Sequence, residues 1–124
     1  MWRSKLIFLM AVVLSLSGLF LGTAQASDPT QLEQFLRTNS CPKCDLTEAN
    51  LLGLGMAKAD LRGAFLGSAN LYRANLLEAD LTGADLTGAD LSGANLKDAK
   101  GVDFTNAKTN LQTICPNGSN GPCQ

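Results

Sequence analysis

The sequence of 124 residues contains no histidine. Histidine is the side chain that enzymes use most often as a general base near neutral pH. The acidic residues also recur at even spacing instead of clustering, so the sequence pattern brings no nucleophile and base together. We therefore expect no enzyme activity, no cofactor and no catalytic residue.

Aromatic residues are also scarce. Beyond residue 26 they are limited to Phe35, Phe65, Tyr72 and Phe104. So few rings cannot pack the core of a conventional globular domain, whereas a solenoid filled by stacked small aliphatic side chains needs none. The scarcity of aromatic residues therefore favours a repeat architecture.

The chain has little net charge. It carries ten basic and eleven acidic residues, for a net charge of −1, and loss of residues 1–26 would make this −3 because Arg3 and Lys5 would be removed. Such mild acidity favours solubility. It gives no reason to expect nucleic acid or an anionic membrane as a partner.

The dominant feature of the sequence is a five-residue repeat between residues 69 and 96. Leucine recurs every five residues, alanine stands two residues before each leucine, and Asp or Asn always lies between them. The leucines are Leu71, Leu76, Leu81, Leu86, Leu91 and Leu96. Self-similarity at a fixed short period is typical of solenoid proteins.

The repeat length argues against both a helix and a long strand. On an α-helix each five-residue step would rotate a leucine by about 140°, which spreads the leucines around all sides. In a strand, the two-residue step from Ala to Leu keeps one face, but the three-residue step to the next Ala reverses it. The chain must therefore turn within every repeat, using Asp, Asn, Thr, Ser and Gly. Such bends predict an all-β solenoid with Leu and Ala inside.

The motif resembles that of the pentapeptide-repeat proteins, Ala-(Asp/Asn)-Leu-x-x, over residues 45 to about 109. The resemblance implies a right-handed quadrilateral β-helix with about twenty residues per coil, and therefore about three coils in this chain. Residues twenty apart would stack on one another. This register would place Lys58 beside Glu78 on the outside of the coils.

Residues 1–26 have the pattern of a secretory signal peptide. A positively charged start precedes a largely apolar run at 6–21, and small residues end the segment at Ala26, which predicts cleavage before Ser27. An uncleaved membrane anchor is the alternative, although the run is short for a spanning helix. We therefore expect an exported protein without membrane contact after cleavage. Its compartment would be a periplasm or, as the family resemblance also allows, a thylakoid lumen.

Residues 27–44 are predicted to form an N-terminal helix followed by a Cys-Pro-Lys-Cys segment. Asp28 fits a helix N-cap and Pro29 fits the first helical position, with apolar residues at helical spacing up to about Thr38. We expect this helix to cap the first coil, whose edge would otherwise be open. Binding of a partner by the helix is the alternative.

Cys41 and Cys44 form the only segment that resembles a redox motif. A redox pair usually has its first cysteine at a helix N-terminus, where the helix dipole lowers the thiol pKa. This pair instead follows the predicted helix, and the five-residue frame points both side chains inward. We expect two buried apolar residues, as thiols or as a local disulfide, with thiol–disulfide exchange as the alternative.

One candidate interaction patch combines Leu52, Tyr72, Arg73 and Leu77, which all occupy outward positions. Leu52 would stack on Tyr72, with Leu77 on the neighbouring side of the coil and Arg73 between them. Tyrosine and arginine side chains often anchor protein interfaces. Isolated apolar residues are nevertheless ordinary on protein surfaces. The patch is therefore a hypothesis that depends on how the coils place these side chains.

The regular frame slips by three residues after Ala99, which predicts the end of the coils and a loop-rich tail at 110–124. About three coils would separate the two ends by roughly 15 Å, beyond the reach of a disulfide, which needs Cα atoms within about 7 Å. We therefore expect Cys115 to pair with Cys123. Zinc is the alternative, but a zinc site usually adds a second close pair of Cys or His ligands.

These patterns predict a non-catalytic, exported module with a structural or protein-interaction role. It would be a monomer or a weak end-to-end oligomer, with another protein as its partner. The alternatives are thiol–disulfide exchange at Cys41 and Cys44, and the role of some family members that imitate DNA and inhibit a type II topoisomerase. Those rods are long, strongly acidic and cytosolic, and this chain is similar to them in none of these respects.

Overall fold

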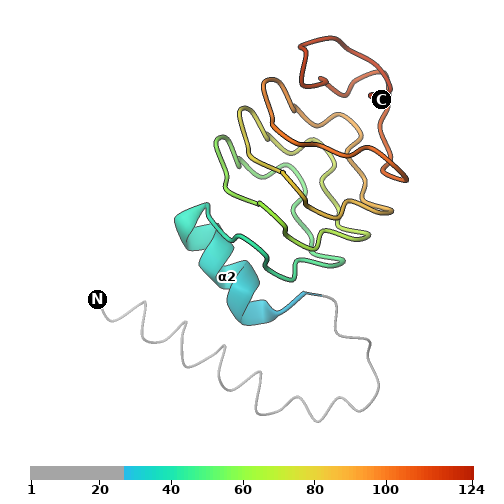
Figure 1. The fold of residues 1–124 in the computed structure, drawn as a ribbon. Helices are drawn as coiled ribbons and strands as arrows, with labels where there is room; N and C mark the ends of the chain where they lie inside the picture. The colour runs from blue at the N-terminus through green and yellow to red at the C-terminus, as the bar shows by residue number, and fades with distance from the viewer. Residues whose placement is uncertain (1–26) are drawn as a thin grey trace.

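The computed structural model describes residues 27–124, so the predicted signal peptide lies outside the described residues. The described chain begins with a helix, α2 (Pro29–Thr38). It then winds through coils stacked along one axis, and the C-terminus lies at the opposite end of the stack from α2 (Figure 1). Neighbouring coils pair through isolated parallel bridges rather than through long strands.

Helix α2 begins and ends where the sequence predicts. Asp28 is the N-cap, and its carboxylate accepts a hydrogen bond of 2.9 Å from the Thr30 N–H. At the other end Asn39 adopts a left-handed conformation, and its N–H donates to the Phe35 carbonyl. The helix buries the Phe35 ring, which is 1% exposed and belongs to the same apolar core as the coils.

Polar contacts also join α2 to the coils. The Asp45 N–H donates to Gln31 Oε1 at 2.7 Å, and the Asp28 N–H donates to the Asp45 carbonyl at 3.2 Å. At the end of the helix, Asn39 Nδ2 donates to the Ala57 carbonyl at 2.8 Å. Both ends of α2 are therefore attached to the beginning of the coiled region.

The coils repeat every twenty residues through most of the chain. Parallel bridges join Asp45 to Phe65 and Phe65 to Asp85, and the same offset recurs on the other sides. Each twenty-residue period contains four turns. In these turns the third residue has a positive φ, for example 57° at Glu48 and 64° at Gly53, while the second does not, which is the pattern of a type II turn. The chain therefore has four sides per coil.

The interior of the coils contains the leucine and alanine side chains of the repeat. The leucines at the third motif position are at most 2% exposed, and the alanines at the first position are at most 9% exposed up to Ala99. Each fully buried leucine contributes about 1.5–3 kcal/mol relative to exposure. Because these side chains fill the interior of successive coils, a binding site must be sought on the outer surface or at the ends of the stack.

The last coil is shorter than the others and extends further than the sequence predicts. The sequence separation between bridged residues falls from twenty to eighteen and then rises to nineteen. The pairs are Asp80 with Lys100, Asp90 with Lys108, and Asn95 with Ile114. The expected end of the coils near residue 109 therefore differs from the observed stacking, which reaches Ile114. The frame slip is absorbed by a shorter path at 101–106 instead of ending the coil.

Gly101 makes this shorter path compatible with close packing. Its φ is +64°, and a Cβ atom placed there would lie 2.5 Å from the Cα atom of Thr82 in the coil below. Only glycine combines this backbone conformation with such a close approach. The last coil is therefore in tight contact with its neighbour at this corner.

Candidate functional site

The outward Asp and Asn side chains bind the backbone of their own turns. Asn70 Oδ1 accepts a hydrogen bond of 3.1 Å from the Tyr72 N–H, and Asp90 Oδ1 accepts one of 3.0 Å from the Ser92 N–H. The same contact recurs on all four sides of the coils. These are Asx turns, in which the side chain replaces a backbone acceptor. The outward polar columns therefore stabilise the turns.

Hydrogen bonds within these turns keep the carboxyl groups ionised. The Thr82 hydroxyl and N–H lower the pKa of Asp80, and the hydroxyl and N–H of the second following residue likewise lower the pKa of Asp85 and Asp90. A carboxyl group with a lowered pKa is a weak general base and is not protonated near neutral pH to act as an acid. The carboxylates are thus suited to holding turns rather than to proton transfer.

Two ion pairs lie on the outside of the coils. Lys58 Nζ lies 3.6 Å from Glu78 Oε2, which confirms the pairing predicted from the twenty-residue register. The Arg62 guanidinium donates two hydrogen bonds of 2.7 Å to the Asp60 carboxylate and lowers the pKa of that group. Exposed pairs of this kind add little stability. They do, however, leave these charges already satisfied within the protein.

The structure places three of the four predicted patch residues on one corner. The Gly53 N–H donates to the Tyr72 carbonyl at 2.9 Å, which stacks Leu52 next to Tyr72 along the coil axis. Arg73 Cζ lies 5.1 Å from the centroid of the Tyr72 ring, a distance typical of a cation–π contact. Leu77 lies at the next corner, five residues further along the coil. The patch therefore spans two neighbouring corners, as the five-residue register predicts.

Leu111 belongs to the same corner as Tyr72. Its turn stacks on the turn below because the Gly93 N–H donates to Asn110 Oδ1 at 3.0 Å. Sequence reasoning missed Leu111 because it ended the coils too early. The triplet Thr113-Ile114-Cys115 was an available signal, since it repeats the inward–outward–inward pattern of a further rung, with Thr113 and Cys115 buried.

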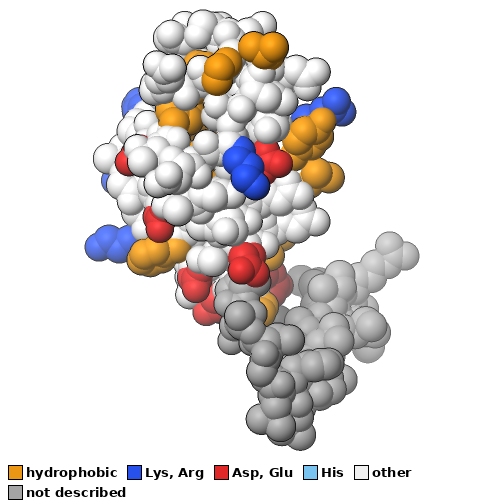
Figure 2. All heavy atoms as spheres, turned by 90° about the vertical axis from the view of Figure 1, so that its right-hand side faces the viewer, with side chains coloured by type: hydrophobic (Ala, Val, Ile, Leu, Met, Phe, Trp, Pro, Cys, Tyr) orange, Lys and Arg blue, Asp and Glu red, His pale blue; other side chains and the backbone are white. Residues whose placement is uncertain are grey.

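The corner patch is defined here as Leu52, Tyr72, Arg73 and Leu111. Leu52 is 54% exposed and Leu111 is 78% exposed, while Tyr72 is half-buried beneath the exposed Arg73. On the face shown in Figure 2, apolar side chains form separate groups among charged and polar ones. This face therefore offers small apolar contact sites rather than one extended apolar surface.

Cys41 and Cys44 form a disulfide within the first coil, with Cα atoms 5.4 Å apart. Cys41 is fully buried and Cys44 is 7% exposed, so both side chains point inward as the five-residue frame predicts. Cys41 Sγ also lies 3.6 Å from the carbonyl oxygen of Gln31 in α2. The pair thus lies where the helix meets the coils.

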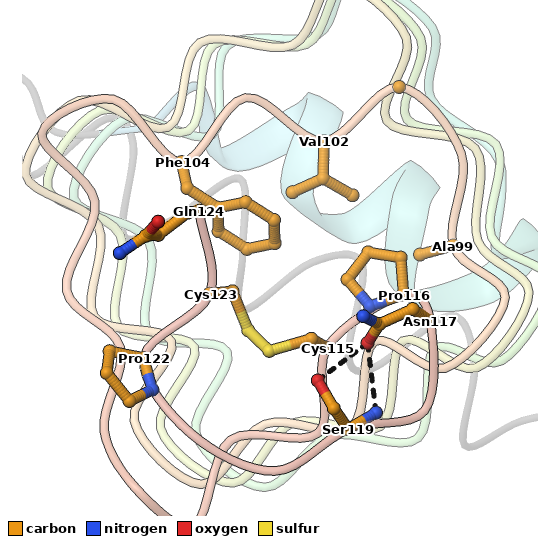
Figure 3. A pocket seen from close by; sticks show the side chains of 11 residues that line it. Ala99, Val102, Phe104, Cys115, Pro116, Asn117, Ser119, Pro122, Cys123 and Gln124 are labelled. Atoms are coloured by element: carbon orange, nitrogen blue, oxygen red, sulfur yellow. Dashed lines mark hydrogen bonds between the residues drawn. A yellow bond between two sulfur atoms is a disulfide. The ribbon is translucent and has the colours of Figure 1, made fainter.

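Residues 116–124 fold back over the C-terminal end of the coils. Cys115 and Cys123 form the second disulfide, with Cα atoms 5.6 Å apart. Between this segment and the last coil lies a recess of about 530 Å³, with Val102, Phe104 and the disulfide around its opening (Figure 3). The C-terminal end is therefore covered without being filled.

Within residues 27–124, no group of three or more Cys, Asp or Glu side chains is arranged to hold a metal ion. No helix in that part of the chain has the length and apolar character needed to cross a membrane.

Comparison with known families identifies the repeat. A family profile for pentapeptide repeats matches residues 66–108 in 8 copies. The chain belongs to the pentapeptide-repeat family. Among solved structures, a pentapeptide repeat protein from the cyanobacterium Cyanothece 51142 is 32% identical, with a TM-score of 0.59 over 61% of this chain and 53% of that one. This likeness implies that the pentapeptide-repeat coils form a right-handed quadrilateral β-helix.

Two further pentapeptide-repeat structures are similar over parts of the chain. HetL from the cyanobacterium Nostoc sp. strain PCC 7120, which is involved in heterocyst differentiation regulation, is 40% identical, with a TM-score of 0.43 over 60% of this chain and 40% of its own. A protein from the Arabidopsis thaliana thylakoid lumen is 26% identical, with a TM-score of 0.30 over 65% of each chain. The chain spans about half the length of the Cyanothece protein and less than half of HetL. No curated protein matches it.

Proposed function

We propose that this pentapeptide-repeat protein is an exported, non-catalytic module that binds a protein partner through the corner patch. The observation that carries the proposal is the alignment of exposed Leu52, Leu111 and the Tyr72–Arg73 pair along one outer corner. Tyrosine and arginine dominate the binding energy of many protein interfaces. The ring held under the guanidinium is a pre-organised anchor of this kind.

Two features support export. Residues 1–26 carry the charge and hydropathy pattern of a signal peptide. In addition, all four cysteines lie in two disulfides, which persist in oxidising compartments such as a periplasm and are rare in the cytosol. A periplasm or a thylakoid lumen is the compartment that we propose.

Helix α2 supports a structural role at the N-terminal end. Its buried Phe35 ring and the hydrogen bonds of Asp28 and Gln31 to Asp45 attach it across the first coil. Open coil ends expose apolar side chains and unpaired backbone groups that invite pairing with another chain. We therefore assign α2 the role of a cap that keeps the coils from stacking on other molecules at this end.

The arrangement of charges favours a protein partner over imitation of DNA. Acidic and basic side chains are interspersed on the face shown in Figure 2, and Asp60 and Glu78 are paired with Arg62 and Lys58. A surface that imitates DNA needs a continuous strip of unpaired negative charge. The burial of Cys41 likewise favours a structural disulfide over an exchange-active one at that pair.

The proposal is tested by crosslinking the full chain in its native compartment and identifying the captured protein. Tyr72→Ala together with Leu111→Ala should reduce the captured amount by about tenfold or more, since loss of an interface anchor costs about 1.4 kcal/mol or more. Phe65→Ala is the matched control, because this ring is 53% exposed but lies on another side of the coil. Equal capture by all three proteins would contradict the assignment of the corner patch.

A further inference from the structure

The C-terminal segment 116–124 is held to the coils by few contacts. An antiparallel bridge joins Ile114 to Asn120, and the Gly121 N–H donates to the Thr113 carbonyl at 3.1 Å. The Asp98 N–H of the coil below donates to the Pro116 carbonyl at 2.9 Å. Of the nine residues in the segment, Gly121 alone is buried, and it has no side chain to pack. Hydrophobic burial therefore contributes little to its attachment.

The Cys115–Cys123 disulfide provides the covalent attachment of this segment. Figure 3 shows the disulfide at one side of the recess, opposite Val102 and Phe104, and Pro116 and Gln124 also line the recess. The Cys123 N–H adds a hydrogen bond of 3.1 Å to Thr109 Oγ1. Without the disulfide, the segment would retain a handful of hydrogen bonds beside a recess of about 530 Å³.

The two disulfides of the chain differ in their access to solvent. Cys41 is fully buried and Cys44 is 7% exposed where α2 meets the first coil, whereas Cys115 is 7% exposed and its partner Cys123 is partly buried beside the recess. Thiol–disulfide exchange requires a thiolate to reach one sulfur of the bond. Because Cys123 is the most exposed of the four cysteines, a reductant has better access to the second disulfide than to the first.

We propose that the Cys115–Cys123 disulfide is a redox-sensitive latch, whose reduction by a dithiol releases residues 116–124 and uncovers the recess beside Val102 and Phe104. The coils and the Cys41–Cys44 disulfide remain as they are. The latch thus converts the C-terminal end from a covered surface to an open one on which Val102 and Phe104 are more exposed. It acts at a place separate from the corner patch.

The exchange is balanced by the dithiol alone. One of its thiolates attacks Cys123 Sγ, the protein S–S bond breaks, and Cys115 leaves as a thiolate that takes up a proton. The second thiolate of the dithiol then attacks the mixed disulfide and releases Cys123 as a thiol. The protein disulfide has gained two electrons and two protons, and the dithiol has been oxidised to a disulfide.

The test exposes the purified full chain to dithiothreitol, traps free thiols with an alkylating reagent at increasing times, and locates them by mass spectrometry. Cys115 and Cys123 should be alkylated at least about tenfold faster than Cys41 and Cys44, in line with their difference in access. Equal rates, or faster reduction of the first pair, would overturn the proposal.

Hydrogen exchange and binding of an apolar fluorescent dye then test the release itself. After selective reduction, amides in 116–124 should exchange at least about tenfold faster, dye fluorescence should rise several-fold, and protection within 46–96 should be unchanged. A Cys115→Ala/Cys123→Ala variant should show this open state without reductant, while Cys41→Ala/Cys44→Ala should keep the end closed. Unchanged exchange in 116–124, or loss of protection throughout the coils, would contradict a local latch.

Discussion

The two ends of the stacked coils are covered in different ways. At the N-terminal end, α2 inserts the Phe35 ring into the core, where it is 1% exposed. At the C-terminal end, Phe104 is half-buried and stands beside a recess of about 530 Å³. The same residue type is therefore part of the core at one end and part of the wall of an opening at the other.

This difference follows from the residues available to each cover. An amphipathic helix offers one apolar face and satisfies its own backbone hydrogen bonds, so it can lie flat on a coil. The tail at 116–124 consists of Pro, Asn, Gly and Ser, which favour turns, with one cysteine and a final glutamine, and these residues leave little to bury. Packing therefore holds α2 on the first coil, whereas the Cys115–Cys123 disulfide is the main attachment of residues 116–124.

Removing each ring tests this comparison most strongly. Phe35→Ala should lower the free energy of unfolding by about 3–5 kcal/mol, the range for a buried phenylalanine. Phe104→Ala should cost about 1–2 kcal/mol, because part of its ring area is already exposed to water. Urea unfolding of the two variants measures both values. Equal losses would mean that the ends are packed equally well.

A pair of glycine substitutions tests whether the loose packing at the C-terminal end already begins between the last coil and the coil before it. Gly101→Ala should destabilise by about 2–5 kcal/mol, since it adds roughly 1–2 kcal/mol for a left-handed alanine to a clash with Thr82 that costs roughly 1–3 kcal/mol. Gly53 has the same φ of +64°, but no atom lies within 4 Å of a Cβ placed there. Gly53→Ala should therefore cost only the roughly 1–2 kcal/mol of a left-handed alanine.

Thermal or urea unfolding of both variants distinguishes the two terms. A clear difference would show that the last coil is tightly packed against the preceding coil at Gly101. The loose packing would then begin on the other side of the last coil, at the recess. If both variants lost the same stability, the last coil would already be loosely attached at Gly101.

The regular coils could be predicted from the sequence because every rung repeats the same local rule. The alternation of two- and three-residue steps fixes which side chains point inward, so the burial of Leu71 or Ala74 follows from spacing alone. The start of α2 was equally local, since Asp28 and Pro29 satisfy the needs of a helix N-terminus by themselves.

The last coil and the corner patch depend on contacts that no local rule contains. The shorter path at 101–106 requires Gly101 to approach Thr82, a residue nineteen positions earlier in the chain. Since this path shifts the frame, it also decides that Leu111 joins the corner of Tyr72. Leu77 lies on the neighbouring side of the coil, as the five-residue register predicts.

A smaller effect is expected from the polar attachment of α2. Gln31 Oε1 accepts the Asp45 N–H at 2.7 Å, and Gln31 Nε2 donates to Asp28 at 2.9 Å, so Gln31→Ala should cost about 1–2 kcal/mol. Gln34→Ala is the matched control on the same helix, because that side chain is exposed. Chemical denaturation should separate the two variants. Similar losses would show that α2 is held by its apolar contacts alone.

The smallest expected effect concerns pH, because the two covers use different residues for the same turn contact. Asp28 accepts hydrogen bonds from the Thr30 hydroxyl and N–H, and these lower its pKa in the folded state. In the tail, Asn117 accepts the Ser119 N–H at 2.9 Å through an amide that does not titrate. Acid should therefore loosen the N-terminal cover selectively.

The sign follows from the direction of the shift. A lowered folded-state pKa stabilises the start of α2 above the unfolded value of about 3.9, and this contribution is lost as the pH falls through the lower folded value. Hydrogen exchange, corrected for its intrinsic pH dependence, should show the first turn of α2 opening relative to residues 117–119 as the pH falls from about 5 to about 2. Asp28→Asn keeps an N-cap acceptor without a titrating group. An undiminished pH response in this variant would place the acid-sensitive contact elsewhere.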